Sequence, residues 1–509
     1  MGAAVVNEIV DAVVIGTGAG GAPLLARLAQ AGLRVVALEA GRHRDPEGYV
    51  NDETLSADLY WQGERLAGGA MPQAFGANNS GIGVGGSTLH WGAFTPRVDA
   101  RDLALRSETG QGRDWPVTLQ ELTPLYEELE GYLGISGPAH YPWDPARRYP
   151  LPPVARNAPA DAMALGCGRL GITTCDAPAA VVSQDYQQPG GPLRQACVSC
   201  GYCHQGCRNR AKVSMDVTFL PLAVSHGAEI RANCFANGFE RDSQGRVTAV
   251  LYVEAGEQKR QLCRAVFLCA GAVETPRLLL HTGLANSSGQ VGRNYMAHVA
   301  TQVWGTFPAE MRGNKGWPSS LMTEAMVRPV DADFAGGYLI QSLGVVPQTW
   351  ADQVARGRGL WGQALVDYID RYNFTAGLGI NGECLPSGDN RLTLSDEVDD
   401  TGLPKPRIDF GYGDNEQRLH RHAERVMTEI WQAAGATDIW TLHRAAHTIG
   451  TCRMGTDKDD AVVNPFGQSF DIGNLWICDN SVFPSSLAAN PALTIMALSL
   501  RTARAFLAQ

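Results

Sequence analysis

The sequence has no apolar run long enough to cross a bilayer, which in helical form takes about 20 residues. Its apolar segments, such as residues 265–273, are much shorter. Residues 1–10 also lack a basic region followed by a long apolar stretch, so we expect no export signal in the chain itself. The sequence therefore predicts no membrane-spanning segment and a cytoplasmic location.

The chain also lacks a basic tract. Its 42 Lys and Arg residues are outnumbered by 52 Asp and Glu residues, which gives a net charge of -10. Nucleic acids and anionic membranes attract basic surfaces, so this balance argues against either as a partner. Hydrophobic residues make up 44% and charged residues 18% of the 509 positions, as expected of a globular protein with two or so domains.

Most cysteines are not arranged as in a disulfide-stabilised protein. Eight of the twelve are scattered along the chain, several of them within apolar segments, which favours a reducing compartment. They stand at positions 167, 175, 234, 263, 269, 384, 452 and 478.

The other four cysteines, Cys197, Cys200, Cys203 and Cys207, lie within eleven residues that read C-V-S-C-G-Y-C-H-Q-G-C. The first three have the C-x2-C-x2-C spacing of bacterial ferredoxins, and without Cys200 the run reads C-x5-C-x3-C. Three or four thiolates this close suit an iron-sulfur cluster, either 3Fe-4S or 4Fe-4S. Zinc is disfavoured because no second ligand pair is evident. The ferredoxin pattern is itself incomplete, since Arg208 stands where a proline commonly follows the last cysteine. Free thiols or one local disulfide are the alternative.

A nucleotide-binding pattern opens the chain. Residues 9–15 form an apolar run, broken by one Asp, that is typical of a buried parallel strand and leads into G-T-G-A-G-G at 16–21. Gly16, Gly18 and Gly21 fill the G-x-G-x-x-G positions. They permit a tight turn, close approach of a pyrophosphate, and close packing of a helix on the strand.

The residues after this loop complete the pattern. A helix ending at Gly32 and a strand over residues 34–38 are expected next. Glu39 then follows the loop at about the twenty-residue separation needed to accept hydrogen bonds from a ribose with a free 2′-hydroxyl. The whole arrangement predicts a dinucleotide site for FAD or NAD.

Four later segments carry further motifs. They are a glycine-rich stretch at 81–92 containing Gly85, Gly86, Ser87 and His90; a strand, small-residue turn and helix at 266–284; H-T-I-G-T-C-R-M-G at 447–455; and residues 475–494, which contain Asp479 and A-A-N-P-A-L-T. In this order, and together with the first glycine loop, they resemble the glucose-methanol-choline (GMC) family of flavoprotein oxidoreductases.

The resemblance implies an α/β (α+β) fold of the p-hydroxybenzoate-hydroxylase type. It has a Rossmann-like FAD-binding domain and a substrate domain built on an antiparallel sheet. On this pattern the FAD domain takes residues 8–105, 206–300 and 446–509. Residues 106–205 and 301–445 form the substrate domain and the cysteine-rich insertion.

The resemblance also implies roles for single residues. His447 opens the segment that supplies the active-site base in this family, Asn490 precedes Pro491 at a position beside the flavin, and Asp479 matches an acid that helps to fix FAD. Alcohol oxidation requires removal of the hydroxyl proton, and imidazole, with a reference pKa of about 6.5, suits that task. His90 resembles a histidine that some relatives link covalently to the flavin, and a packing contact with the isoalloxazine ring is the alternative.

Two other features have structural interpretations. Thr118 followed by residues 121–133 predicts a capped amphipathic helix. His420 and His422 lie two apart in a charged run, so they face different sides of a helix. We expect both to be solvated and not to bind a metal jointly.

The sequence thus predicts an FAD-dependent enzyme that oxidises the alcohol group of a sugar, polyol or aromatic alcohol and passes electrons to an acceptor, with the cysteine cluster as one route. It resembles the pyranose oxidase branch and the large subunits of gluconate and glucose dehydrogenases, which associate with a cytochrome and a small subunit carrying an export signal. With such a partner the location would be periplasmic. The alternatives are an oxidase that makes hydrogen peroxide without a cluster, and a redox-neutral lyase.

Overall fold

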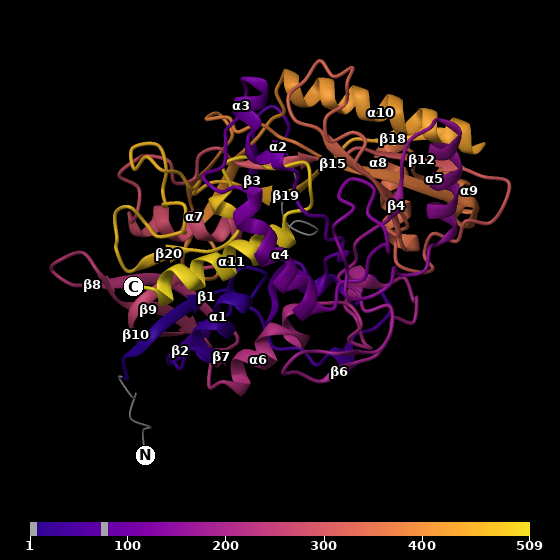
Figure 1. Ribbon diagram of the computed structural model, residues 1–509. Coiled ribbons are helices and arrows are strands. Elements are labelled where there is room, and N and C mark those ends of the chain that lie inside the picture. Colours follow the sequence, from indigo (N-terminus) through magenta and orange to yellow (C-terminus); the bar gives the residue numbers. More distant parts are fainter. Residues whose placement is uncertain (1–7, 73–79) are drawn as a thin grey trace.

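The computed structural model describes residues 8–72 and 80–509, so part of the N-terminal segment considered above lies outside the described residues. Two large sheets surrounded by helices dominate the architecture (Figure 1). The helices are α1 (Gly21–Gln30), α2 (Ala100–Leu103), α3 (Leu105–Thr109), α4 (Leu119–Leu133), α5 (Ala158–Arg169), α6 (Phe219–Ser225), α7 (Gly271–Thr282), α8 (Pro347–Arg358), α9 (Gly362–Ile369), α10 (Asp414–Ala434) and α11 (Ala492–Leu507). The strands are β1 (Val10–Ile15), β2 (Val35–Leu38), β3 (Leu66–Gly68), β4 (Cys175–Asp176), β5 (Tyr186–Gln187), β6 (Leu193–Arg194), β7 (Glu229–Arg231), β8 (Cys234–Arg241), β9 (Val247–Glu254), β10 (Glu257–Leu268), β11 (Met296–Val299), β12 (Gln302–Thr306), β13 (Leu321–Thr323), β14 (Tyr338–Leu343), β15 (Thr375–Gly382), β16 (Arg391–Val398), β17 (Pro404–Asp409), β18 (Thr437–Leu442), β19 (Ala445–Ile449) and β20 (Leu475–Ile477).

The first sheet carries the N-terminal nucleotide pattern. Its strands follow the order β7-β2-β1-β10-β9-β8, with β20 also paired to β10. β1 runs parallel to β2 and β10, β20 runs parallel to β10, and β9 is antiparallel to β10. Ala12, Val13 and Val14 are all fully buried, and because consecutive residues face opposite sides, both faces of β1 are covered.

The parallel strands of this sheet bring distant loops together. β1, β10 and β20 run in one direction, so the segments that follow them meet at a single edge of the sheet. These segments are the glycine loop at 16–21, the turn before α7, and Asp479. Ligands bind at this edge in open α/β sheets, so the fold places the candidate nucleotide loops where a site is expected.

The second sheet is antiparallel, with the order β18-β12-β15-β14-β13-β4 and with β11 joining β15 to β19. α10 and α5 pack together over one face of this sheet, where Leu378 of β15 and Trp431 of α10 share an apolar core (Figure 1). Gly379 and Asn381 of β15 line a cavity instead. One sheet with a parallel centre and one antiparallel sheet confirm the predicted fold class, while the domain boundaries stay a prediction.

Local expectations compare closely with these elements. The first strand, helix and second strand end within a residue or two of their predicted positions. α4 begins with a capping box in which Thr118 and Glu121 exchange hydrogen bonds, as expected. The expectation that both histidines of α10 are solvated was wrong: His420 contacts His443, and His422 contacts the Tyr338 hydroxyl, because α10 lies against the sheet.

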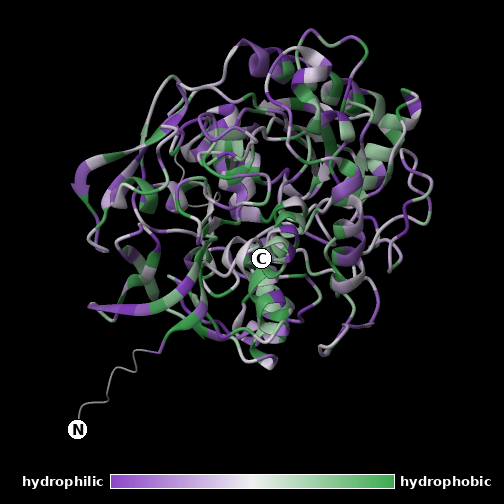
Figure 2. Cartoon of the chain, turned by 60° about the vertical axis from the view of Figure 1, so that its left-hand side comes forward, coloured by the Kyte–Doolittle hydropathy of each residue, from purple (hydrophilic) through white to green (hydrophobic). Residues whose placement is uncertain are grey.

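Purple hydrophilic and green hydrophobic stretches alternate along the helices and strands (Figure 2). Over residues 8–72 and 80–509, we find no helix with the length and apolar character required to cross a bilayer.

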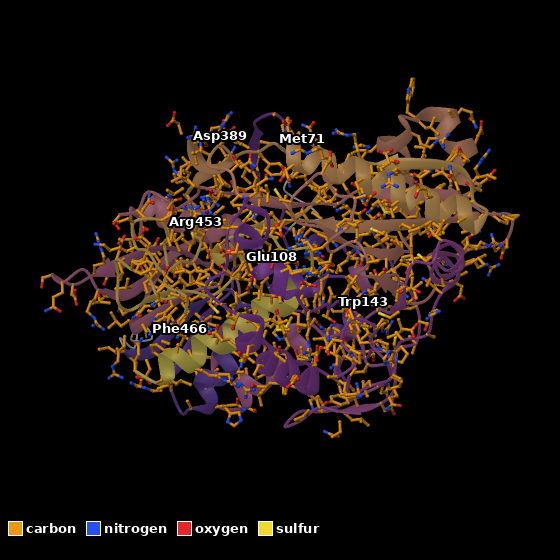
Figure 3. The ribbon with its side chains drawn as sticks, turned by 45° about the horizontal axis from the view of Figure 1, so that its top comes forward. Met71, Glu108, Trp143, Asp389, Arg453 and Phe466 are labelled. Atoms are coloured by element: carbon orange, nitrogen blue, oxygen red, sulfur yellow. The ribbon has the colours of Figure 1, made fainter. Side chains whose placement is uncertain are left out.

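The C-terminal helix α11 is contacted on its outer side by a loop that contains Phe466. The Arg501 guanidinium of α11 lies over the Phe466 ring, 4.1 Å from its centre (Figure 3).

Candidate active site

A cavity of about 860 Å³ lies between the two sheets and receives residues from both. Every predicted site residue outside the cysteine cluster lines it, except Gly21 and Gly85. Its volume lies in the upper part of the range of about 300–1,000 Å³ that small-molecule sites occupy. The fold thus assembles residues between positions 16 and 491 into one site.

The glycine loop closes one end of this cavity, and two of its positions leave no room for a side chain. Gly16 has a φ of +97°, and a Cβ there would lie 2.5 Å from the carbonyl oxygen of Cys269. A Cβ on Gly20 would lie 1.8 Å from the carbonyl oxygen of Cys478. The loop therefore packs directly against the ends of β10 and β20, and its open backbone suits a pyrophosphate at the start of α1.

We expect Gly20→Ala to lower the free energy of unfolding by about 1–3 kcal/mol and to weaken FAD retention, because the new methyl group overlaps backbone. Thermal unfolding and the flavin content of purified protein measure both effects. The matched control is Gly168→Ala within α5, where a Cβ meets nothing within 4 Å. An equally stable, fully flavinated Gly20→Ala variant would refute this account.

Two buried carboxylates hold the loops around the nucleotide end. Glu39 accepts bonds from Thr17 N at 3.0 Å, Thr17 Oγ1 at 2.8 Å, Gly41 N at 3.0 Å and Gly83 N at 3.3 Å. Burial raises the pKa of Glu39, and these donors oppose that shift. Since its four acceptor positions are met by the protein, a ribose hydroxyl would have to share them.

Asp479, which follows β20, is the second buried carboxylate that accepts hydrogen bonds from neighbouring loops. Its carboxylate accepts bonds from Gly271 N at 2.8 Å, Thr275 Oγ1 at 2.6 Å and Ser481 N at 2.8 Å. Burial raises its pKa, while Ser481 and Thr275 oppose the change. Asp479 therefore fixes the start of α7 against the chain that leads to Asn490.

His447 and Asn490 both line the cavity. His447 lies in β19, and Asn490 lies just before α11. His447 has a φ of +59°, a strained conformation for a residue with a large side chain. Asn490 Oδ1 accepts a hydrogen bond from Asn381 Nδ2 at 3.0 Å, which leaves the Asn490 amide NH₂ as a donor. A base candidate and a donor thus share the same cavity.

A second histidine, which the sequence did not indicate, lies behind His447. His298 Nδ1 is 2.9 Å from His447 Nδ1, with the two rings nearly perpendicular at 89°. The pairing of β11 with β19 shifts register between Ala297 and His298. Such a bulge redirects a side chain, and here it brings His298 to His447.

The contacts of His298 determine the tautomers of both rings. Its Nε2 is 2.9 Å from the carbonyl oxygens of Ser486 and Leu487, which can only accept, so Nε2 carries hydrogen. Burial lowers the pKa of His298 to about 4, so the ring is neutral and its Nδ1 accepts. The hydrogen between the rings therefore belongs to His447 Nδ1, and Nε2 of His447 keeps a free lone pair.

His90 lies at another part of the cavity wall, with its ring 4.4 Å from that of Tyr60. Burial lowers the pKa of His90 to about 3. Its Nε2 is buried without a hydrogen-bond partner among the residues described. Together with the facing glycines, where a Cβ on Gly86 would lie 2.8 Å from Gly18 Cα, this polar atom fits a planar cofactor in the cavity.

The four clustered cysteines lie beside the same cavity and surround a second, small one of about 10 Å³. All twelve cysteines of the chain are free thiols. Backbone N–H groups of Ser199 and Lys212 point to Cys197 Sγ at 3.4 Å and Cys207 Sγ at 3.3 Å. Such bonds to sulfur also accompany metal-bound thiolates, so the four sulfurs are candidate metal ligands.

The cysteine loop is joined to the stretch around His90. His204 Nδ1 lies 2.9 Å from the carbonyl oxygen of His90. The buried ammonium of Lys212 donates to the carbonyl oxygens of Leu89 at 2.8 Å and Cys203 at 2.7 Å. These contacts, which the sequence did not indicate, place the four sulfurs close behind the cavity wall.

Other motif residues act at a distance from the cavity. Arg453 of the H-T-I-G-T-C-R-M-G segment forms an ion pair with Asp460 and donates to the Asp460 carbonyl oxygen at 2.7 Å (Figure 3). Its role in this structure is to hold the loop that follows the segment.

Comparison with known proteins identifies this arrangement. Two sequence models described as GMC oxidoreductase match residues 154–300 and 386–499. The chain belongs to the GMC oxidoreductase family. This GMC oxidoreductase is 29% identical to the fructose dehydrogenase large subunit of Gluconobacter japonicus, over 98% of the chain and 97% of that protein. It is 28% identical to the gluconate 2-dehydrogenase flavoprotein of Pantoea cypripedii, over 99% and 95% of the two chains.

Solved structures agree on the fold. The pyridoxine 4-oxidase of Mesorbium loti superposes with a TM-score of 0.71 at 17% identity, covering 98% of this chain and 99% of that one. Formate oxidase gives a TM-score of 0.72 at 13% identity, covering 99% and 98%. The predictions of a GMC flavoprotein, of FAD as cofactor and of an oxidoreductase acting on CH–OH groups are confirmed.

Proposed function

We propose that this GMC oxidoreductase oxidises an alcohol group of a polyhydroxylated small molecule, such as a sugar or polyol, with His447 as the base. One observation supports His447 as the base, and another supports the polyhydroxylated substrate. The fixed tautomer of His447 leaves Nε2 ready to accept a proton. Polar side chains line the same cavity, which suits several hydroxyl groups better than an aromatic alcohol; they are Gln302, Gln341, Gln353, Asn381 and Arg444.

The residues would act in a simple division of tasks. The Asn490 amide NH₂ would donate a hydrogen bond to the alcohol oxygen and orient it. His447 Nε2 accepts the hydroxyl proton, and the positive charge that develops on the ring is shared through the His298 contact. Bound FAD would supply the acceptor for the hydride that leaves the alcohol carbon. Gly16, Gly18, Glu39, Gly86 and Asp479 would hold that cofactor.

We further propose that electrons leave through an iron-sulfur cluster on Cys197, Cys203 and Cys207, with or without Cys200. The sulfurs lie next to the wall that carries His90, and Gly201 lines both the large and the small cavity. Two relatives are named as a large subunit and a flavoprotein of dehydrogenases. A small subunit and a cytochrome or other acceptor would then be the partners, and the location periplasmic if the partner carries the export signal.

A cysteine series tests the exit route. Wild-type protein is expected to contain about three or four iron atoms per flavin, and Cys207→Ala to lose most of them, since Cys207 belongs to both ligand readings. Cys200→Ala separates the readings, because it keeps iron only in a three-ligand cluster. Iron and sulfide analysis beside anaerobic flavin bleaching measures this, and Cys167→Ala is the control for a thiol elsewhere. Iron-free wild-type protein would contradict the route but not the alcohol oxidation.

An oxygen-using enzyme is the second candidate function. One relative is named as the 6'''-hydroxyparomomycin C oxidase of Streptomyces lividus, at 28% identity over 98% of this chain. Oxygen uptake with substrate alone would favour that reading. Flavin that stays oxidised when substrate is added without oxygen would instead indicate a redox-neutral lyase.

The attachment of the flavin is a separate proposal. The Nε2 of His90, which has no hydrogen-bond partner within residues 8–72 and 80–509, would either pack against the isoalloxazine ring or form a covalent bond with it. Flavin that remains with acid-precipitated protein distinguishes the bond from the contact.

A further inference from the structure

A cluster of potential metal ligands lies apart from the active site, between α10 and the end of β18. It consists of His420 and Glu424 of α10 and of His443, which directly follows β18. One ligand atom from each residue lies within 4.8 Å of the other two. His420 and Glu424 are one helical turn apart and so share a face of α10. None of the three lines the described wall of the active-site cavity.

The separations suit a shared ion. His420 Nε2 is 3.0 Å from His443 Nε2, and His443 Nε2 is 3.9 Å from Glu424 Oε2. An ion bound by nitrogen and oxygen at about 2.0–2.2 Å with tetrahedral angles requires ligand atoms about 3.3–3.5 Å apart. The two observed distances fall on either side of that value, so small side-chain rotations would meet it.

Hydroxyl groups orient two of the ligands from behind. Thr301 Oγ1, which is fully buried, contacts His420 Nδ1. Thr441 Oγ1 donates to Glu424 Oε1 at 2.8 Å. Each contact occupies the atom that faces away from the cluster, leaving Nε2 and Oε2 directed at the shared point. Outer hydrogen bonds of this kind fix metal-binding histidines and carboxylates in proteins.

We propose that His420, Glu424 and His443 bind a divalent transition metal such as Zn²⁺, with water completing its coordination. Two imidazoles and one carboxylate favour zinc, copper or nickel over calcium or magnesium, which take mainly oxygen ligands. The ion ties α10 to β18. Because Leu442 and Arg444 on either side of His443 line the active-site cavity, the tie also fixes one wall of that cavity from outside.

A direct hydrogen bond between the two imidazoles is the competing explanation of the 3.0 Å contact. The two differ in what they require of Glu424: a metal uses its carboxylate as a ligand, whereas the imidazole pair does not need it. They also differ in their response to added ion, which would leave a simple hydrogen bond unchanged.

The test is Zn²⁺ binding to chelator-treated, flavin-loaded enzyme. Isothermal titration calorimetry and metal analysis after gel filtration measure the number of bound ions. Wild-type protein is expected to bind one equivalent more than His443→Ala, Glu424→Gln or His420→Ala, because the cysteines contribute equally in all of them. His443 is the safest position to replace, since 56% of its side chain is exposed. Exposed His226→Ala is the control and should match wild type.

A conservative variant separates ligation from folding. Thr441→Val keeps the shape of the side chain but removes the bond to Glu424, so it is expected to weaken Zn²⁺ binding by about 10- to 100-fold. Added Zn²⁺ should raise the melting temperature of wild type more than that of His443→Ala. Equal stoichiometry and equal shifts in wild type and His443→Ala would overturn the proposal and leave the hydrogen bond as the explanation.

Discussion

Replacing His447 by alanine is expected to slow anaerobic reduction of the bound flavin by about a hundredfold or more. The reason is that His447 Nε2 has the only lone pair that the paired rings leave free to accept a proton. Stopped-flow bleaching of the flavin with excess alcohol measures the rate directly, without dependence on the acceptor. Flavin content must be compared first, so that a lost cofactor is not mistaken for a lost base.

Two further variants make this result specific. His447→Asn keeps a group that can donate to His298 but has no titratable ring nitrogen, so its rate should stay as low as that of the alanine variant. Exposed His226→Ala should bleach at the wild-type rate. Bleaching of His447→Ala at an unchanged rate would remove His447 as the base.

Replacing His298 by alanine is expected to lower the rate of flavin reduction by about tenfold to a hundredfold, because His447 loses the acceptor that fixes its tautomer. His298→Asn should recover part of the rate, since its amide oxygen can accept from His447 and its NH₂ can donate to the carbonyl oxygens of Ser486 and Leu487. A purely structural role would give no such recovery.

The pH profile provides a second reading of the same pair. Burial lowers the pKa of His447 well below its usual value, and the positive charge of Arg444 lowers it further. A base must be unprotonated, so kcat/KM should remain high until the pH falls well below about 6.5. Because neutral His298 accepts from His447 Nδ1 and so favours the protonated ring, its loss should move the acid limb to still lower pH. An unmoved limb in His298→Ala would limit that residue to packing.

Features whose residues lie close together along the chain could be predicted from the sequence. The glycine loop, its strands and Glu39 lie within about thirty residues, so their spacing already specifies the strand-loop-helix unit. His447 and Asn490 were predicted because motifs surround them. Those motifs fix the family, yet they do not say which side chains lie behind the base.

The residues that sequence reasoning missed depend on long-range pairing. His298 contacts His447 across 149 positions, through a register shift between β11 and β19. No residue type in these strands predicts that shift. Asn381 reaches Asn490 across 109 positions. His420 was expected to be solvated because the charged run around it hides the contact of α10 with the sheet. Spacing along a chain contains no information on which strands become neighbours.

The ammonium of Lys212 bears on how the holoenzyme matures. One buried side chain organises the backbone on both sides of the shared wall, through the Leu89 and Cys203 carbonyl oxygens. Filling either the FAD site or the proposed cluster site would pre-order the other, and such coupling is reciprocal by thermodynamic necessity. If the proposed cluster forms, cells starved of iron should therefore yield protein poor in flavin as well, and cells starved of riboflavin should yield protein poor in iron.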